Sequence, residues 1–317
     1  MTRLLTLIAA ALPLLAATGP AASAASAPAR PYVPAGVKAG YVVLDRQTGR
    51  ITSQRDAHRR FRSASVVKIM IAIDYLESHP SVPRDDLALL GKMLRVSDDD
   101  AATSFWTRGG RGRIVERTVR RLRLTDTAPP PADKPGFWGY TSISAADIAL
   151  TYRYLLDRAS PRVRDLVLGH LRNAGQCGSD GFDQFFGIPR AVPRPWAVKQ
   201  GWSGYGSTPP ARCRPTAAPS GPASGSVPDA PEQAATPPAG QGVPAPAAPA
   251  RSGSASVVAA GPVPDLGHPV LHTTGLVGPG ERWIMVLLTA HPSGTTWSRS
   301  TAQTTTLAKQ VYLSGTS

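Results

Sequence analysis

A serine and a lysine lie three positions apart in the stretch FRSASVVKIM, residues 61–70. Residues at this spacing are neighbours on one face of a helix, so the Ser65 hydroxyl and the Lys68 amine are predicted to lie within contact distance. Apolar neighbours partly desolvate an amine, which disfavours its charged form and lets it accept a proton. A hydroxyl beside such an amine is an activated nucleophile. The pair alone also fits a structural interpretation, in which Lys68 extends to solvent and Ser65 only begins a helix.

The segments around this pair predict strands near both ends of the chain and helices between them. Residues 39–54 contain two β-rich runs around RQTGR, which is typical of a hairpin. Apolar spacing and cap signals predict helices at 65–78, 84–96, 142–159 and 298–315. Further strands are predicted at 195–202, 269–278 and 282–291. This order predicts an α+β domain with one antiparallel sheet.

The beginning of the chain has the composition of an export signal. Residues 1–24 combine an early arginine, a short apolar run interrupted by Pro13, and small residues at the end that are typical of a cleavage site. No cysteine follows this run, and no later segment has the roughly twenty unbroken apolar residues of a membrane span. We therefore expect a secreted, extracytoplasmic monomer with neither a lipid anchor nor a stable membrane span.

Composition divides the remaining chain into a tail, one domain and an insertion. Residues 25–37 are predicted to form a flexible tail, and residues 38–202 together with 263–317 are predicted to form one catalytic domain. Residues 203–262 between the two parts are dominated by Pro, Ala, Gly and Ser. Such a segment cannot bury enough apolar surface to hold a structure, so we expect a disordered insertion.

The chain is strongly basic, with a formal net charge of +14. Its arginines are scattered, and most are expected to form a solvated face. An exported chain without a recognisable nucleic-acid-binding module is expected to meet anionic polymers of the cell envelope rather than nucleic acid. The sequence contains no metal-binding helix, phosphate-binding loop or dinucleotide fingerprint, so we expect no metal and no cofactor.

Two cysteines, Cys177 and Cys213, are the only ones in the sequence. Export to an oxidising compartment favours one disulfide between them over a metal site or a catalytic pair. Two free thiols too far apart to join remain the alternative.

Three stretches in order carry a resemblance to a known family. Ser65-Val66-Val67-Lys68, Ser97-Asp98-Asp99 and Lys199-Gln200-Gly201 resemble the signatures S-x-x-K, S-D-N and K-T-G of class A β-lactamases and penicillin-binding proteins. The resemblance covers residues 38–202 and 263–317. It implies an antiparallel sheet with a flanking terminal helix, together with an all-helical lobe.

The resemblance also implies a role for each matching residue. Ser65 would attack an amide or β-lactam carbonyl, and Lys68 would accept its proton or form part of the relay. Ser97 would pass a proton to the departing nitrogen. Lys199 would hold its charge toward the substrate carboxylate and polarise Ser97. The backbone N–H groups of Ser65 and Trp202 would form the oxyanion hole.

The sequence departs from the family pattern at positions that face the substrate. Asp99 stands where the family has asparagine, and Gln200 stands where it has threonine; with Gly201, these positions would bind the substrate. The loop at 125–140 contains no glutamate, the residue that activates the deacylating water in class A β-lactamases. Asp133 in this loop is the candidate replacement as deacylation base.

These departures define three functional hypotheses. The first is an exported serine hydrolase that forms an acyl-enzyme with β-lactams and hydrolyses them, slowly if no group activates water. The second is a penicillin-binding protein similar to D-Ala-D-Ala peptidases, with a peptidoglycan peptide as its substrate. The third is a catalytically impaired relative that binds peptidoglycan fragments or β-lactams.

Overall fold

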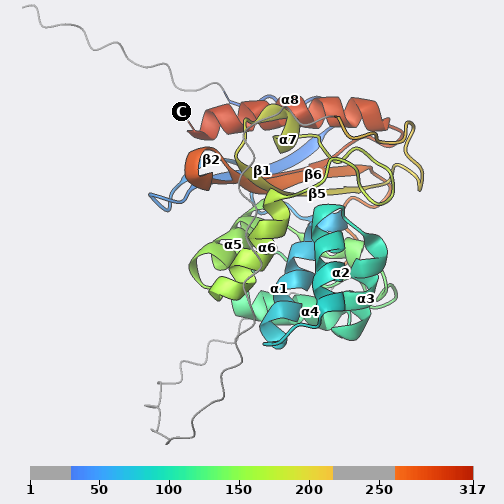
Figure 1. Ribbon diagram of the computed structural model, residues 1–317. Helices are drawn as coiled ribbons and strands as arrows, with labels where there is room; N and C mark the ends of the chain where they lie inside the picture. Colours follow the sequence, from blue (N-terminus) through green and yellow to red (C-terminus); the bar gives the residue numbers. More distant parts are fainter. Residues whose placement is uncertain (1–29, 217–260, 317) are drawn as a thin grey trace, which may run out of the picture.

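A five-stranded antiparallel sheet separates two helical layers in the computed structural model, which describes residues 30–216 and 261–316 (Figure 1). The strand order is β2-β1-β7-β6-β5. The long C-terminal helix α8 covers one face of the sheet, and helices α1 to α6 form a lobe below the other face. This arrangement confirms the predicted α+β fold with a terminal helix against the sheet.

The sheet confirms the strands predicted from the sequence. Its members are β1 (Lys38–Asp45), β2 (Ile51–Arg55), β5 (Trp196–Ser203), β6 (Val270–Val277) and β7 (Trp283–Ala290). The predicted hairpin is the β1–β2 pair, and the short helix η3 (Pro279–Glu281) joins β6 to β7. A separate two-stranded sheet pairs β3 (Phe61–Arg62) with β4 (Ser142–Ile143). Strand β5 forms one edge of the large sheet, where it pairs with β6 alone. The site described below lies beside this edge strand.

The helical lobe contains the predicted helices and further helices that the sequence analysis missed. The lobe elements are η1 (Ala64–Val67), α1 (Lys68–Ser78), α2 (Arg84–Arg95), α3 (Asp99–Arg108), α4 (Gly112–Leu122), η2 (Trp138–Tyr140), α5 (Ala145–Asp157) and α6 (Pro161–Arg172). Helices α7 (Ile188–Ala191) and α8 (Trp297–Thr316) lie against the sheet. The missed α4 buries apolar residues among its arginines, and the missed α6 begins with a Ser160 cap followed by proline.

Helix α1 passes through the centre of the lobe and presents its first residues to the sheet. Every residue from Lys68 to Leu76 is buried, as expected of a helix that is surrounded on all sides. The preceding helix η1 packs against β5 at Gly201. A Cβ at this position would lie 3.1 Å from the carbonyl oxygen of Ser63 and 3.1 Å from the backbone nitrogen of Val66. Gly201 therefore allows the start of the helix to approach the edge strand closely.

The domain boundaries predicted from composition fall partly outside the described residues. Residues 1–29, with the predicted signal peptide, and residues 217–260 of the predicted insertion are not described. Within the described part, Ser203 ends β5, and the following loop is held by a disulfide between Cys213 and Cys177. The structured domain thus extends beyond the predicted boundary at residue 202, because a covalent bond and the Cys213 N–H donated to Gly181 (2.8 Å) fix this loop.

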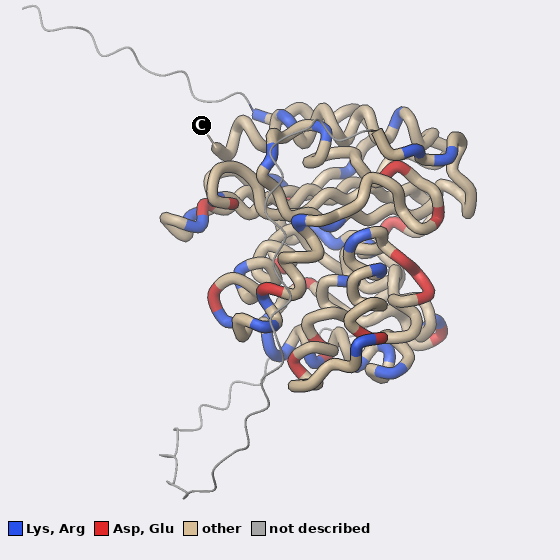
Figure 2. Tube along the Cα trace, viewed as in Figure 1, with Lys and Arg blue, Asp and Glu red and all other residues tan. Residues whose placement is uncertain are grey.

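Basic residues are spread over both the sheet layer and the helical lobe (Figure 2). Many are paired with acidic residues across elements, including Arg282 with Asp45 and Arg172 with Glu281. Within residues 30–216 and 261–316, no helix is both long and apolar enough to cross a membrane.

One buried carboxylate fixes the segment that leads into the loop beside the site. Asp147, in the first turn of α5, is fully buried and accepts hydrogen bonds from the backbone N–H groups of Thr125 (3.1 Å), Asp126 (2.8 Å) and Thr127 (2.7 Å). The Thr127 hydroxyl donates a fourth bond at 2.7 Å. Because buried N–H groups are costly to leave unpaired, this side chain determines how the 125–140 loop departs from α4.

We predict that Asp147→Ala lowers the free energy of unfolding by about 3–5 kcal/mol, because it leaves several buried donors without an acceptor. Urea unfolding followed by circular dichroism measures this change. The matched control on the same helix is Asp157→Ala, which removes only an exposed ion pair with Arg153 and should cost less than about 1 kcal/mol. Equal losses in the two variants would contradict the role given to Asp147.

Candidate active site

Ser65 lies in helix η1 at the wall of a cavity of about 340 Å³. The residue before it, Ala64, has a left-handed φ of 43°, a strained conformation of the kind that clusters at functional sites. Asp99, Asp180 and Trp202 also line the cavity, together with the loop at 136–140. Among the described residues, none forms a hydrogen bond with the Ser65 hydroxyl. The hydroxyl is therefore available to a ligand.

Lys68 is fully buried, and its ammonium is held by three acceptors. Its Nζ donates to the Asp99 carboxylate (2.6 Å), to the Ser97 carbonyl (2.6 Å) and to the Ser97 hydroxyl (3.3 Å). The nitrogen also lies 4.7 Å from the ring centre of Trp138. Burial lowers the pKa of Lys68, and the Asp99 carboxylate opposes that shift. These contacts direct the amine away from Ser65, so the predicted contact between the two side chains is not formed as a hydrogen bond.

Ser97 stands between α2 and α3 in a left-handed conformation, with a φ of 59°. The next residue, Asp98, caps α3 by accepting the backbone N–H of Ala101 at 2.8 Å, as expected for a residue that holds this turn. The turn aims both the carbonyl and the hydroxyl of Ser97 at Lys68. Its hydroxyl oxygen is also 2.9 Å from the Nζ of Lys199.

Lys199 approaches the same hydroxyl from strand β5. Its side chain is buried, and its Nζ also donates to the carbonyl of Gln200 at 3.0 Å. Burial, followed by the nearby positive charge of Lys68, lowers the pKa of Lys199 well below its usual value. Asp99 contacts Lys68 directly, so the charge is held there and Lys199 is the amine that more readily loses its proton. Lys199 is not among the described residues that line the cavity, and its expected interaction with a substrate carboxylate stays a prediction.

The residues predicted to bind substrate have different positions. Asp99 does line the cavity, and Trp202 contributes its indole ring to the wall. Gln200 does not line the cavity, because its side chain is buried and donates to the carbonyl of Phe186 at 2.6 Å. Gly201 is also absent from the wall and instead permits the close packing of β5 on η1. The expectation that Gln200 contacts substrate is therefore corrected.

The predicted deacylation base also lies outside the cavity. The side chain of Asp133 is 74% exposed, and its nearest charged partner is Lys134 at 3.8 Å. The loop that carries it instead gives the cavity an aromatic wall formed by Phe137, Trp138 and Tyr140. Asp133 is therefore not among the described residues that line the cavity of Ser65.

A carboxylate that the sequence analysis did not identify faces the cavity. Asp180 accepts hydrogen bonds from the Trp202 indole N–H (3.0 Å) and the backbone N–H of Phe182 (3.1 Å). Desolvation by the surrounding protein raises the pKa of Asp180. Its loop begins at the Cys177–Cys213 disulfide, whose Cα atoms are 5.5 Å apart. No motif or periodicity marks Asp180, since the loop structure alone brings it to the cavity.

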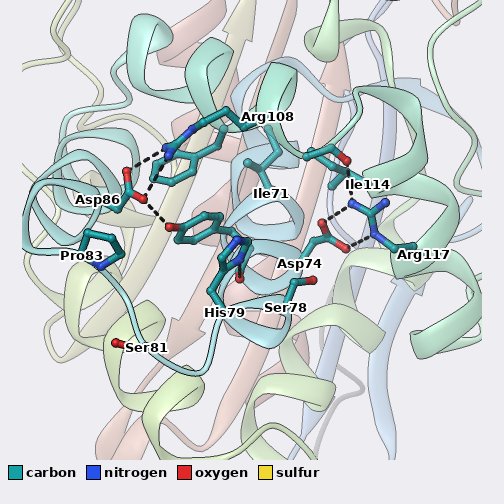
Figure 3. Close-up of a pocket in the computed structure, with 13 residues that line it drawn as sticks. Ile71, Asp74, Ser78, His79, Ser81, Pro83, Asp86, Arg108, Ile114 and Arg117 are labelled. Carbon is teal, nitrogen blue, oxygen red and sulfur yellow. Dashed lines mark hydrogen bonds and ion pairs between the residues drawn. The ribbon is translucent and has the colours of Figure 1, made fainter.

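A second cavity of about 660 Å³ lies in the helical lobe between α1, α2, α3 and α4 (Figure 3). Its two sides carry Arg–carboxylate pairs, Arg108 with Asp86 and Arg117 with Asp74, each with two hydrogen bonds. None of the three motif segments lines it, so the chemistry of the motifs belongs to the first cavity. Across the described part of the chain, no group of three His, Cys, Asp or Glu residues is arranged to bind a metal ion.

The chain has related sequences in mycobacteria, although no protein-family model matches it. It is 37% identical over 175 residues to proteins of Mycobacterium tuberculosis and Mycobacterium bovis that are both named "Putative lipoprotein LppW". The match covers 53% of this chain and 54% of each relative, so the chain spans about half the length of the curated relatives it matches.

Solved structures resemble the chain over most of its length. A class A β-lactamase from Mycobacterium abscessus has a TM-score of 0.55 at 17% identity and covers 88% of this chain and 94% of its own. PBP-A has a TM-score of 0.54 at 13% identity and covers 88% of this chain and 90% of its own. A β-lactamase from Xanthomonas campestris has a TM-score of 0.55 at 14% identity and covers 87% of this chain and 91% of its own. The chain therefore has the fold of the class A β-lactamases and penicillin-binding proteins.

Proposed function

We propose that this protein is an extracytoplasmic serine hydrolase of the β-lactamase-like type, in which Ser65 forms an acyl-enzyme with β-lactams and releases it slowly. The observation that carries the proposal is the single hydroxyl of Ser97, which accepts hydrogen bonds from both Lys68 and Lys199 next to the Ser65 cavity. The hydrogen bonds of Ser97 thereby join residues of all three motifs, next to the cavity that Ser65 lines. The proposed location outside the cytoplasm is supported by the composition of residues 1–24 and by the names of the mycobacterial relatives.

The protonation of the two lysines supports a specific path for acylation. In this path the Ser65 oxygen forms a bond to the β-lactam carbonyl carbon, and the ring C–N bond breaks. The Ser65 proton passes through Ser97 to the neutral amine of Lys199. Ser97 then donates a proton to the departing nitrogen and takes one back from the Lys199 ammonium, which returns this amine to its neutral form. Lys68, held as an ammonium by Asp99, is the poorer base. The required hydrogen bond from Ser65 would form only with substrate bound, as is common for catalytic contacts.

Stabilisation of the developing negative charge is assigned to backbone groups. The N–H of Ser65 in η1 and the N–H of Trp202 on the edge strand β5 are the proposed donors to the oxyanion. Such donors are fixed by the fold and cost no reorganisation during the reaction. Gly201 supports this arrangement because it brings β5 against η1.

Slow deacylation is proposed because the 125–140 loop brings no carboxylate to the cavity. The exposed position of Asp133 gives the 125–140 loop no carboxylate that could activate water in the cavity. A structural neighbour, PBP-A, was solved as an acyl-enzyme complex with penicillin G, in a mutant form. We therefore favour a penicillin-binding protein with slow turnover over an efficient β-lactamase, with a peptidoglycan peptide as the natural substrate.

A non-catalytic binding protein is the second candidate, favoured by one observation. The Asp99 carboxylate lies 2.6 Å from the Lys68 ammonium, where the family pattern has a neutral amide. This ion pair opposes the loss of the Lys68 proton. If it prevents acylation altogether, the cavity would only bind ligands without modifying them.

Exposure to penicillin separates these two candidate functions. Incubation with excess penicillin G should raise the intact mass of the protein by the mass of one penicillin, and Ser65→Ala should abolish this increase. The control Ser203→Ala removes another hydroxyl from the wall of the same cavity and should keep the adduct. Wild-type protein that stays unmodified at saturating penicillin would refute the enzymatic proposal in favour of the binding protein.

The second prediction concerns the ion pair. Asp99→Asn restores the amide of the family pattern and removes a negative charge that raises the pKa of both Lys68 and Lys199, so acylation should become faster. At a pH below the pKa of Lys199, each unit by which that pKa falls raises the neutral fraction of the base about tenfold, and we expect a gain of about that size. Stopped-flow acylation by a chromogenic cephalosporin measures it. Asp100→Asn, an exposed neighbour outside the cavity wall, should leave the rate unchanged; a slower Asp99→Asn enzyme would contradict the argument.

The third prediction is the pH dependence of acylation. The base acts only when it is deprotonated, so the rate should rise with pH and then level off. Because burial lowers the pKa of Lys199, this rise should occur well below the ordinary lysine pKa of about 10.4. Lys199→Arg cannot lose its proton and should remove the rise while leaving a slow, pH-independent rate. A rise that persists in this variant, with its fold intact by circular dichroism, would exclude Lys199 as the base.

A further inference from the structure

The wall of the Ser65 cavity carries negative charge and no positive charge among the described residues. Asp99 and Asp180 both line it, whereas no described lysine or arginine does. The two catalytic amines lie beneath the wall, with Lys68 and Lys199 at most 1% exposed. A ligand that enters the cavity therefore meets carboxylates before it meets either ammonium.

Both carboxylates have capacity for a further donor. The side chain of Asp99 is 67% exposed, and only its Oδ1 is used, by Lys68. Asp180 accepts two neutral N–H groups, from Trp202 and Phe182, and has no ion pair with any described residue. Each carboxylate oxygen can accept more than one hydrogen bond. Desolvation raises the pKa of Asp180, and the nearby charge of Lys68 opposes that shift.

The rest of the cavity wall is aromatic. Phe137 is 57% exposed and stacks on Tyr140 with ring centres 5.1 Å apart, and Trp138 and Trp202 complete the wall. The ring of Trp138 already holds one ammonium, that of Lys68, at 4.7 Å from its centre. Aromatic faces and carboxylates together are the surroundings that attract an amine cation. A carboxylate ligand would instead be repelled by Asp99 and Asp180.

We propose that this cavity selects acyl donors that carry a positively charged amine, bound between Asp99, Asp180 and the aromatic wall. The inference rests on the proposed function in that the amine belongs to the acyl group transferred to Ser65. The chemical class is a peptide or β-lactam with an unblocked ammonium on its acyl side chain. The preference concerns that side chain, because every penicillin also carries a carboxylate on its ring system.

Three penicillins with one scaffold test this preference. Benzylpenicillin, ampicillin and carbenicillin differ at one side-chain carbon, which carries hydrogen, an ammonium or a carboxylate. Second-order rate constants of Ser65 acylation, measured by intact mass against time, should fall in the order ampicillin, benzylpenicillin, carbenicillin. We expect at least about a tenfold difference between the first and the last, equivalent to about 1.4 kcal/mol. Equal rates or the reverse order would overturn the inference.

Two variants test whether a carboxylate of the cavity wall causes the preference for ampicillin over carbenicillin. Asp180→Asn keeps the size of the side chain and removes its charge, so it should reduce the ratio between ampicillin and carbenicillin several-fold. Asp100→Asn, an acidic residue of α3 that does not line the cavity, should keep the ratio of the wild type. A ratio that changes equally in both variants would mean that overall charge, rather than the cavity, sets the preference.

A binding measurement separates this inference from the proposed chemistry. In Ser65→Ala, which cannot be acylated, nuclear magnetic resonance titration should give tighter binding for benzylamine than for neutral benzyl alcohol, and Asp180→Asn should weaken that difference. If no penicillin acylates the wild type but the amine preference holds, the proposed function fails, and of the inference only the preference of the cavity for an amine stands. If penicillins acylate without any preference and benzylamine binds no better than benzyl alcohol, the inference fails and the function stands.

Discussion

The site is organised by one hydroxyl oxygen, that of Ser97, within hydrogen-bond reach of two buried amines. Two ammonium groups this close in a dry interior repel each other strongly, so one of them must give up its proton readily. The choice between them is made by Asp99, which contacts Lys68 and not Lys199. The positive charge is therefore favoured on Lys68 of the helix, and the pKa of Lys199 on the strand is lowered. The proposed proton path follows from this division.

The geometry of the backbone makes this division possible. Ser97 has a left-handed conformation, which the Asp98 cap stabilises by fixing the start of α3. On the other side, Gly201 brings the edge strand against η1, and the Thr274 hydroxyl donates to the Lys199 carbonyl at 2.8 Å, which fixes the strand at that residue. Ser65, Lys68 and Lys199 thus lie on helices and a strand, and Ser97 lies in a turn that the Asp98 cap fixes.

The fold and the inner part of the site could be predicted because their signals are local. The S-x-x-K motif sets Ser65 and Lys68 on one helix, and apolar periodicity marks the strands and most helices. The residues that face the ligand were harder to predict. Lys199 and Gln200 are consecutive residues of one strand, yet the Lys199 side chain reaches Ser97 whereas the Gln200 side chain donates to the Phe186 carbonyl, a partner outside that strand. Asp133 and Asp180 lie in loops, where no periodicity determines which side chain points inward.

The same fold can therefore present opposite charges to its ligand, depending on which groups it buries. Both lysines are buried beneath the wall beside the Ser97 hydroxyl, and burial lowers the pKa of each. Replacing an amide by Asp99 then stabilises the buried ammonium and leaves a carboxylate edge in the cavity. In the proposed function, Asp99 thus affects both the basicity of the two amines and the charge of the ligand that is attracted. For this reason the electrostatics of the site cannot be inferred from the family's motifs, even where the motifs themselves are present.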